Sequence, residues 1–158
     1  MIITGIDVGF SGGICTLDVE RNIVALYKMP VVKSDAGNEL DYRALYSIIN
    51  VSDFICVEKQ HSMPKNGVKQ SFNFGGQYYS IRAIIRISDK KSEYITPQRW
   101  KKYLLQSMDK SNKGSSIERA KQIYPYINLI PDGCRKEHDG LADAFLIAWY
   151  AKQYILGV

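Results

Sequence analysis

With 158 residues, of which 46% are hydrophobic and 23% charged, the chain has the size and composition of one ordinary globular domain. No apolar run approaches the length of a membrane-spanning helix, so we expect no membrane association. The N-terminal residues lack a basic region and a cleavage site of small residues, so we expect a cytoplasmic protein without a secretory signal. Three cysteines, an odd number without C-x-x-C spacing, indicate a reduced protein, and Cys15 and Cys56 lie in apolar strand-like runs where small buried thiols are expected.

The net charge of +5 is concentrated in one stretch of the chain. From Arg99 to Lys121 there are seven basic residues and two acidic ones, an excess of five that equals the net charge of the whole protein. A local positive field of this size suits a polyanionic partner, although a solvated helix face and loop would show the same pattern.

The first third of the chain is rich in strand patterns. Alternating apolar residues and short polar turns predict three strands joined as an antiparallel meander, over residues 2–9, 13–19 and 22–29. A helix is expected over residues 38–50, because its apolar residues fall on one face. The apolar run 53–58 then predicts a buried strand that ends at Glu58.

The remaining two thirds alternate between helices, loops and one more strand. We expect a loop over residues 60–70, a helix over 72–88 and a strand over 92–96. Three further helices are expected over 97–105, 116–124 and 139–155, with a basic loop over 106–116. This order predicts an α/β fold in which residues 1–158 form one domain. Its mixed five-stranded sheet has three antiparallel strands plus parallel strands, and helices on both faces.

Four acidic residues are placed where carboxylates are uncommon. Asp7 ends an apolar strand before a glycine-rich turn, and Glu58 ends another strand. Asp139 and Asp143 lie four residues apart at the start of the last helix, on one face. Hard oxygen ligands from separate elements suit Mg²⁺, and two such ions about 4 Å apart can support phosphodiester hydrolysis. The four acids therefore predict a metal site.

Three of these acids also have structural interpretations that stay open at this stage. Asp7 could form the turn that follows it, Glu58 could be a solvated strand end, and Asp139 could cap the last helix. Asp143 lies inside that helix and has no comparable alternative. The joint pattern, more than any single residue, favours the metal site.

Four linked motifs resemble the RuvC-type Holliday junction resolvases, and most of all their short phage-encoded members. The motifs are "GIDVGFSGG", "VEKQHSMPKNGVKQSFNFGGQY", "YITPQRWKK" and "HDGLADAFLIAWY". The resemblance implies an RNase H-like fold, a homodimer, and Mg²⁺- or Mn²⁺-dependent nicking of two strands at a four-way DNA junction. Two ions per active site and products with 5′-phosphate and 3′-hydroxyl ends are implied as well. For a phage-encoded protein, the location would be the host cytoplasm.

The resemblance also implies roles for the acidic residues. It matches three of them to the acidic metal ligands of the family, namely Asp7, Glu58 and Asp143. Bacterial members usually carry the two late acids three residues apart, and this chain has Gly140 at the earlier of those positions. Asp139, one residue before it, is our choice as fourth ligand, with His138 as a substitute or a supporting group.

Basic and aromatic residues are assigned to DNA in the same way. Lys101 and Lys113 match lysines near the active site, where they would hold the scissile phosphate and its developing charge. Bacterial members have an aromatic residue three positions after the strand-end glutamate, where it stacks on unpaired junction bases, and this chain has His61 there. An imidazole can stack too, and Phe72 or Phe74 could serve instead. Five more basic residues are expected to contact DNA: Lys65, Lys69, Arg99, Lys102 and Lys110.

Other functions remain as alternatives. The main one is a nuclease of the same fold that prefers forks, flaps or structured RNA. "GIDVGFSGG" also resembles the start of actin-like sugar kinases and ATPases, but those proteins need a second lobe and a second phosphate loop. A non-catalytic DNA-binding module would not require the four acids. The aromatic residues Phe72, Phe74, Tyr78 and Tyr79 could contribute to a dimer interface or could simply pack on the sheet.

Overall fold

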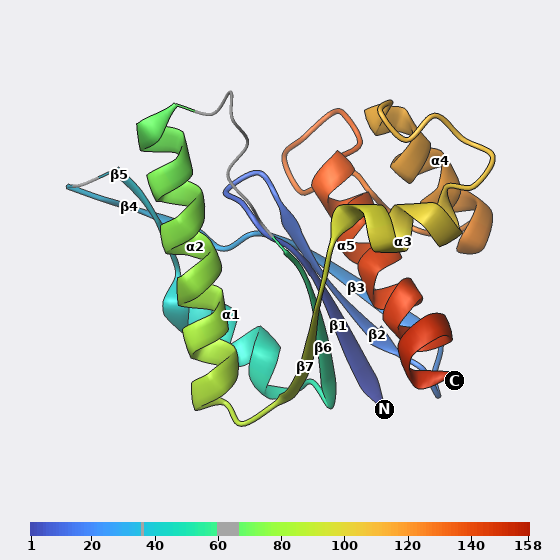
Figure 1. Ribbon diagram of the computed structural model, residues 1–158, viewed down its shortest axis with the longest axis horizontal. Helices are drawn as coiled ribbons and strands as arrows, with labels where there is room; N and C mark the ends of the chain where they lie inside the picture. Colours follow the sequence, from blue (N-terminus) through green and yellow to red (C-terminus); the bar gives the residue numbers. More distant parts are fainter. Residues whose placement is uncertain (36, 60–66) are drawn as a thin grey trace.

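The computed structural model describes residues 1–35, 37–59 and 67–158, without the side chains of residues 68–70 and 113. Its centre is a mixed sheet with the strand order β3-β2-β1-β6-β7 (Figure 1). The strands are β1 (Ile2–Asp7), β2 (Gly13–Asp18), β3 (Ile23–Lys28), β6 (Phe54–Glu58) and β7 (Lys91–Ile95). β1, β2 and β3 are antiparallel, whereas β6 is parallel to β1 and to β7. The predicted five-stranded mixed sheet is confirmed.

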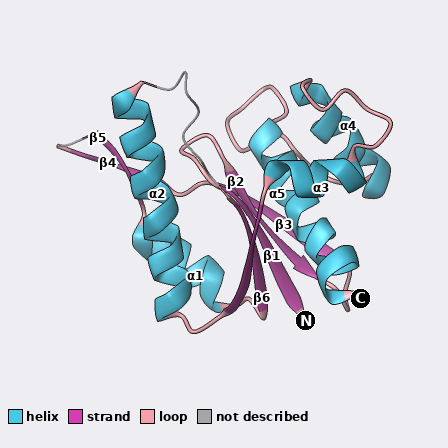
Figure 2. Ribbon diagram, in the orientation of Figure 1, coloured by secondary structure: helices cyan, strands magenta, loops and turns pink. Residues whose placement is uncertain are grey.

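Helices cover both faces of this sheet, as predicted (Figure 2). One face carries α1 (Tyr42–Asn50) and α2 (Val68–Ile87). The other carries α3 (Pro97–Leu104), α4 (Lys113–Ile123) and α5 (Asp139–Tyr150), which continues into the π-helical turn η1 (Ala151–Leu156). Successive residues of a strand point to opposite faces. In β1, Ile3 therefore packs with the buried apolar residues of α5, and Ile6 packs with those of α2. The described residues thus form two hydrophobic clusters, one on each side of the sheet.

A hairpin separate from the main sheet was not predicted. β4 (Val31–Ser34) and β5 (Gly37–Leu40) pair with each other beside the N-terminal part of α2 (Figure 1). The expectation of a helix from residue 38 is therefore wrong for residues 38–40. The helix begins later because Asp41 is its N-cap, and the Asp41 carboxylate accepts hydrogen bonds from two backbone N–H groups of the first turn.

Two predicted loops are shorter than expected. Residues 68–70 belong to α2 and not to the loop that precedes it. Residues 113–115 likewise belong to α4, which begins three residues earlier than expected, because the Asn112 side chain accepts a hydrogen bond from the Gly114 N–H and so caps the helix. None of the described helices combines the length and the apolar character needed to cross a membrane.

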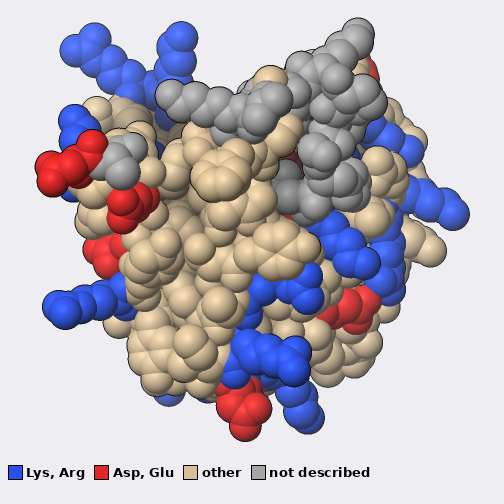
Figure 3. Space-filling view, turned by 60° about the vertical axis from the view of Figure 1, so that its left-hand side comes forward, with Lys and Arg blue, Asp and Glu red and all other residues tan. Residues whose placement is uncertain are grey.

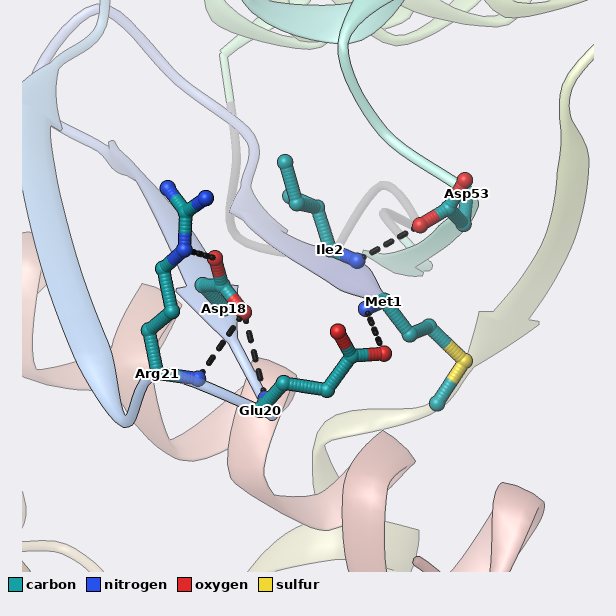
Figure 4. A network of polar contacts seen from close by, with 6 residues as sticks. All are labelled: Met1, Ile2, Asp18, Glu20, Arg21 and Asp53. Carbon is teal, nitrogen blue, oxygen red and sulfur yellow. Dashed lines mark hydrogen bonds and ion pairs between the residues drawn. The ribbon is translucent and has the colours of Figure 1, made fainter.

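The beginning of β1 is fixed by polar contacts to two neighbouring turns (Figure 4). The N-terminal ammonium of Met1 pairs with the Glu20 carboxylate at 2.8 Å. The backbone N–H of Ile2 donates to the Asp53 carboxylate at 2.7 Å. These contacts hold β1 between its two neighbours at the end of the strand opposite to Asp7.

Candidate functional site

The strand register brings two of the predicted acids together. β1 and β6 are parallel neighbours, and Ile6 lies opposite Val57. The next residues, Asp7 and Glu58, therefore lie side by side where the two strands end. Because side chains alternate along a strand, both carboxylates point to the face that carries α3 and α5.

Helix α5 lies unusually close to the sheet. A Cβ atom at Gly5 of β1 would stand 2.2 Å from the carbonyl oxygen of Ala144 and 2.4 Å from the backbone nitrogen of Ala148. Only a glycine leaves room for this contact between the backbones of helix and strand. This close contact fixes the position of α5 along β1, and so the position of the start of α5 relative to Asp7.

The start of α5 has a second close contact, at Gly140. A Cβ atom there would lie 2.6 Å from the Ser11 carbonyl oxygen and 3.0 Å from the Gly12 Cα atom. An acid at position 140 is thus excluded sterically, and Asp139 is the residue that carries the charge. Asp139 is the first residue of the helix, and His138 occupies the cap position, so the interpretation of Asp139 as the N-cap is wrong. The Nδ1 atom of His138 is buried without a hydrogen-bond partner in the described part of the chain.

Three of the acids line one cleft of about 380 Å³. Asp7 comes from the end of β1, and Asp139 and Asp143 come from the first two turns of α5. Two lysines and one aromatic ring line the same cleft, namely Lys101, Lys110 and Phe74. The cleft therefore combines carboxylates with cationic side chains, as an anionic substrate that is bound beside a cation would require.

Glu58 lies deeper than the other acids. It is 8% exposed, and its Oε1 atom accepts a hydrogen bond of 2.8 Å from the indole Nε1–H of Trp100. Trp100 belongs to α3 and is fully buried. A buried indole donor of this kind holds one carboxylate oxygen in place.

The electrostatics of the cleft are dominated by negative charge. Burial raises the pKa of Asp7 well above its usual value, and the charges of Glu58, Asp143 and Asp139 raise it further. The Lys101 ammonium acts in the opposite direction and lowers the pKa of Asp7, without cancelling the rise. A bound cation would relieve this repulsion.

The carboxylates do not form a preformed cation site. Within residues 1–35, 37–59 and 67–158, no three His, Cys, Asp or Glu side chains are close enough to hold a metal ion. Their oxygen atoms are nevertheless the ligands that hard divalent cations prefer. The acids of this site suit such a cation chemically, and their side chains would have to rotate to enclose it.

Other predicted DNA contacts lie outside the cleft. Arg99 is paired with Glu93, and its Nε–H donates to the Tyr150 hydroxyl at 3.0 Å. Lys102 is exposed on α3. Phe72 is 80% exposed and lines a smaller pocket beside the β4–β5 hairpin, so only one of the two phenylalanines reaches the cleft.

Several predictions concern residues about which the structure is silent. His61 and Lys65 lie outside the described residues, and so do the side chains of Lys69 and Lys113. By contrast, Trp100 contacts the site and was not among the predicted residues. Its position next to Lys101 in the motif "YITPQRWKK" and on the apolar side of the expected helix 97–105 was the available signal.

The fold is similar to that of solved Holliday junction resolvases. No protein-family model matches the sequence, and no curated protein matches it. Thermus thermophilus RuvC in complex with a Holliday junction substrate superposes with a TM-score of 0.62, at 17% identity over 99% of this chain and 95% of that one. A second structure of Thermus thermophilus RuvC gives a TM-score of 0.60, at 18% identity over 97% and 96%.

A third similar structure is the yeast mitochondrial Holliday junction resolvase Ydc2. It gives a TM-score of 0.53, at 12% identity over 92% of this chain and 75% of that one. Identities this low establish the fold and nothing finer. This chain has the mixed α/β architecture of RuvC, and the predicted RNase H-like fold class is confirmed.

Proposed function

We propose that residues 1–158 form one nuclease domain that makes paired, symmetric nicks in branched DNA, with the four-way Holliday junction as preferred substrate. The observation that carries this proposal is the gathering of four carboxylates from β1, β6 and α5 at one end of the sheet. It is supported by the similarity in fold to a RuvC structure that contains a Holliday junction substrate.

We further propose Mg²⁺ as the cofactor, with Mn²⁺ as a substitute and two ions per active site. Asp7, Glu58, Asp139 and Asp143 would hold the ions. Carboxylate oxygens from separate elements fit a hard cation, and the raised pKa of Asp7 marks the negative charge that the cation would neutralise. When bound, two such ions stabilise the attacking and the leaving oxygen of a phosphodiester.

The remaining residues of the cleft would position the DNA. Lys101 lines the cleft beside the acids, where its ammonium can donate to a non-bridging phosphate oxygen. Lys110 adds positive charge to the same wall, and Phe74 offers a ring on which an unpaired base can stack. Trp100 would act as a positioning residue, because its N–H fixes the orientation of Glu58.

Paired nicks require two active sites, and we therefore propose a homodimer. Lys113 as a second phosphate-binding lysine, and His61, Lys65 and Lys69 as DNA contacts, remain part of the proposal on the strength of the sequence motifs. The phage-encoded type and the host cytoplasm as its location rest on the same motifs.

The Asp7→Asn variant tests the nuclease assignment directly. With Mg²⁺, its rate of nicking a synthetic four-way junction should fall at least about 10³-fold, because a carboxylate that would hold the ions is lost. Its junction binding in EDTA should be equal to or tighter than wild type, since a charge that repels phosphate is removed. Asp35→Asn, on the turn of the β4–β5 hairpin, makes the same charge change away from the cleft and should nick normally.

Substrate preference needs a parallel comparison of four-way junctions, forks, flaps and duplex RNA. Nicking at the wild-type rate by Asp7→Asn would overturn the metal site. Faster cleavage of forks, flaps or RNA than of junctions would keep the nuclease and overturn the junction preference. A monomer by light scattering at micromolar concentration would overturn the paired nicks.

A further inference from the structure

A second group of basic residues lies away from the cleft, in a pocket between the C-terminal half of α2 and β7. The pocket has a volume of about 440 Å³. Arg82, Arg86 and Lys90 line it, and Tyr79 and Tyr94 form two of its walls. Figure 3 views the side of the molecule that carries α2 and shows basic side chains in its lower centre, with a few acidic side chains beside them.

The arginine in the middle of this pocket is held by aromatic rings. The guanidinium carbon of Arg82 lies 5.6 Å from the ring centroid of Tyr78, 5.5 Å from that of Tyr79 and 5.0 Å from that of Tyr94. Packing against rings orients a guanidinium while leaving the N–H groups at its edge able to donate. Arg82 is therefore a preorganised donor at the pocket wall.

One acidic residue, Asp89, lines this pocket beside the three basic residues, so positive charge remains in excess. Among the described residues, no carboxylate lies within ion-pair distance of Arg82, Arg86 or Lys90. Arg82 and Arg86 are four residues apart on one helix face, where like charges repel by about 0.2–0.5 kcal/mol. Arg86 also lies in the last turn of α2, where a cation suits the helix dipole, and this explains one of the three charges. With Asp89 set against the three basic residues, the pocket keeps an excess of two positive charges, which suits an anionic ligand.

The edge strand β7 runs from this pocket toward the end of the sheet where the acids lie. β7 runs from Lys91, next to the pocket residue Lys90, to Ile95, which pairs with Glu58. Its five residues rise about 3.3 Å each, which amounts to about 17 Å. B-DNA rises about 3.4 Å per base pair, so the same length corresponds to roughly five base pairs. A duplex arm that lies along this edge of the sheet can thus span the distance between the level of the acids and the pocket within half a helical turn.

We propose that the α2–β7 pocket is a second phosphate-binding site, which holds the backbone of a DNA arm about five base pairs from the branch point. This inference rests on the proposed function, since it takes branched DNA as the ligand. Arg82 supplies an oriented donor, and Arg86 and Lys90 supply charge. Contacts of this kind set the direction of the arm without reading its sequence.

The test compares two double variants that remove the same charge. Arg86→Ala/Lys90→Ala alters the pocket but leaves the Arg82 cluster in place, and Lys33→Ala/Arg43→Ala removes two exposed charges from β4 and α1. Binding of a fluorescent four-way junction is measured by anisotropy in EDTA across a salt series. Each lost phosphate contact lowers the slope of log K against log[salt] by about 1. The pocket variant should lose about 2 from this slope and bind about tenfold more weakly, and the control should match wild type.

Uncharged methylphosphonate linkages locate the contact on the DNA. Placed in turn two to eight base pairs from the branch, they should weaken wild-type binding most near the fifth pair. The pocket variant should lose nothing further at that position, because the partner charge is already gone. Simple addition of the two effects, or equal slopes for the pocket and control variants, would overturn the inference.

Two further outcomes separate this inference from the proposed function. If the wild-type protein neither binds nor nicks junctions, the proposed function itself fails. If it does both and the pocket variant behaves as the control, only the second site fails. Loss of the dimer by light scattering in the pocket variant alone would assign this face to a subunit interface and would likewise overturn the proposal.

Discussion

Helices α5 and α2 cover opposite faces of the same sheet, and they differ in how they do so. α5 is buried on almost all sides and touches the backbone of β1 at Gly5. α2 buries one apolar side, including Ile81 and Ile85, and exposes large residues such as Tyr79 on the other. The buried helix α5 places the acids rigidly, whereas the half-exposed helix α2 offers a broad accessible surface.

The largest effect in this comparison is expected from Gly5→Ala. The added methyl group would meet backbone atoms of α5 on two sides, and neither can move without shifting the whole helix. Overpacking typically costs about 1–3 kcal/mol, and a clash with backbone on two sides belongs at the upper end of that range. We expect a large drop in the midpoint of thermal unfolding, and nicking reduced more than stability alone explains. A variant that unfolds like wild type would show that α5 can slide on the sheet.

Asp7→Asn should have an intermediate effect on the free energy of unfolding of the metal-free protein, and it should stabilise the protein where Gly5→Ala destabilises it. The pKa of Asp7 is raised in the folded state, so its ionised form opposes folding once the pH exceeds the ordinary value of about 4. Near neutral pH the variant should be more stable by about 1–2 kcal/mol, a typical gain when an active-site charge is removed.

This stability difference has a defined pH dependence. The advantage of Asp7→Asn should be smallest near pH 4, where Asp7 is protonated in the folded wild type, and should grow as the pH rises through its folded-state pKa. Thermal unfolding in EDTA at several pH values measures it, at about 2–4 °C per kcal/mol for a chain of this size. A difference that does not change with pH would argue against charge repulsion in the cleft.

The smallest effect is expected from Gly76→Ala in α2, the counterpart of Gly5→Ala. A Cβ atom at Gly76 meets nothing within 4 Å, so the methyl group is accommodated without strain. Alanine favours a helix over glycine by about 1 kcal/mol, and the unfolding midpoint should rise by a few degrees. A decrease in the unfolding midpoint would mean that another part of the protein or a second subunit packs against Gly76 in solution.

The fold was predictable where the sequence has a regular pattern. The strands alternate or run apolar, and the helices of the second half repeat with helical spacing, so the mixed sheet could be assigned in advance. The β4–β5 hairpin was missed because its strands are short and mostly exposed, which leaves no periodic signal. The start of α2 was missed because Asn66 and Gly67, both common in turns, directly precede it.

The site was predictable in its acids and less so in its other residues. A carboxylate at the end of an apolar strand is uncommon, so the local sequence alone predicts that it has a functional role. The contact between Trp100 and Glu58 depends on how α3 packs against β6, which no local pattern shows. Phe72 and Phe74 are two residues apart and so lie on nearly opposite sides of α2, a separation that helix geometry could have distinguished. The engagement of Arg99 with Glu93 likewise depends on tertiary packing.

The hydrogen bond between Trp100 and Glu58 also gives the protein an optical reporter. The chain has two tryptophans, and the indole of Trp100 lies 2.8 Å from a carboxylate at the centre of the site. Indole emission responds to nearby charge, so a cation that reaches Glu58 changes the colour or yield of this one chromophore. With Trp149 replaced by Phe, the arrival of the ion could be followed in unlabelled protein before any DNA is added.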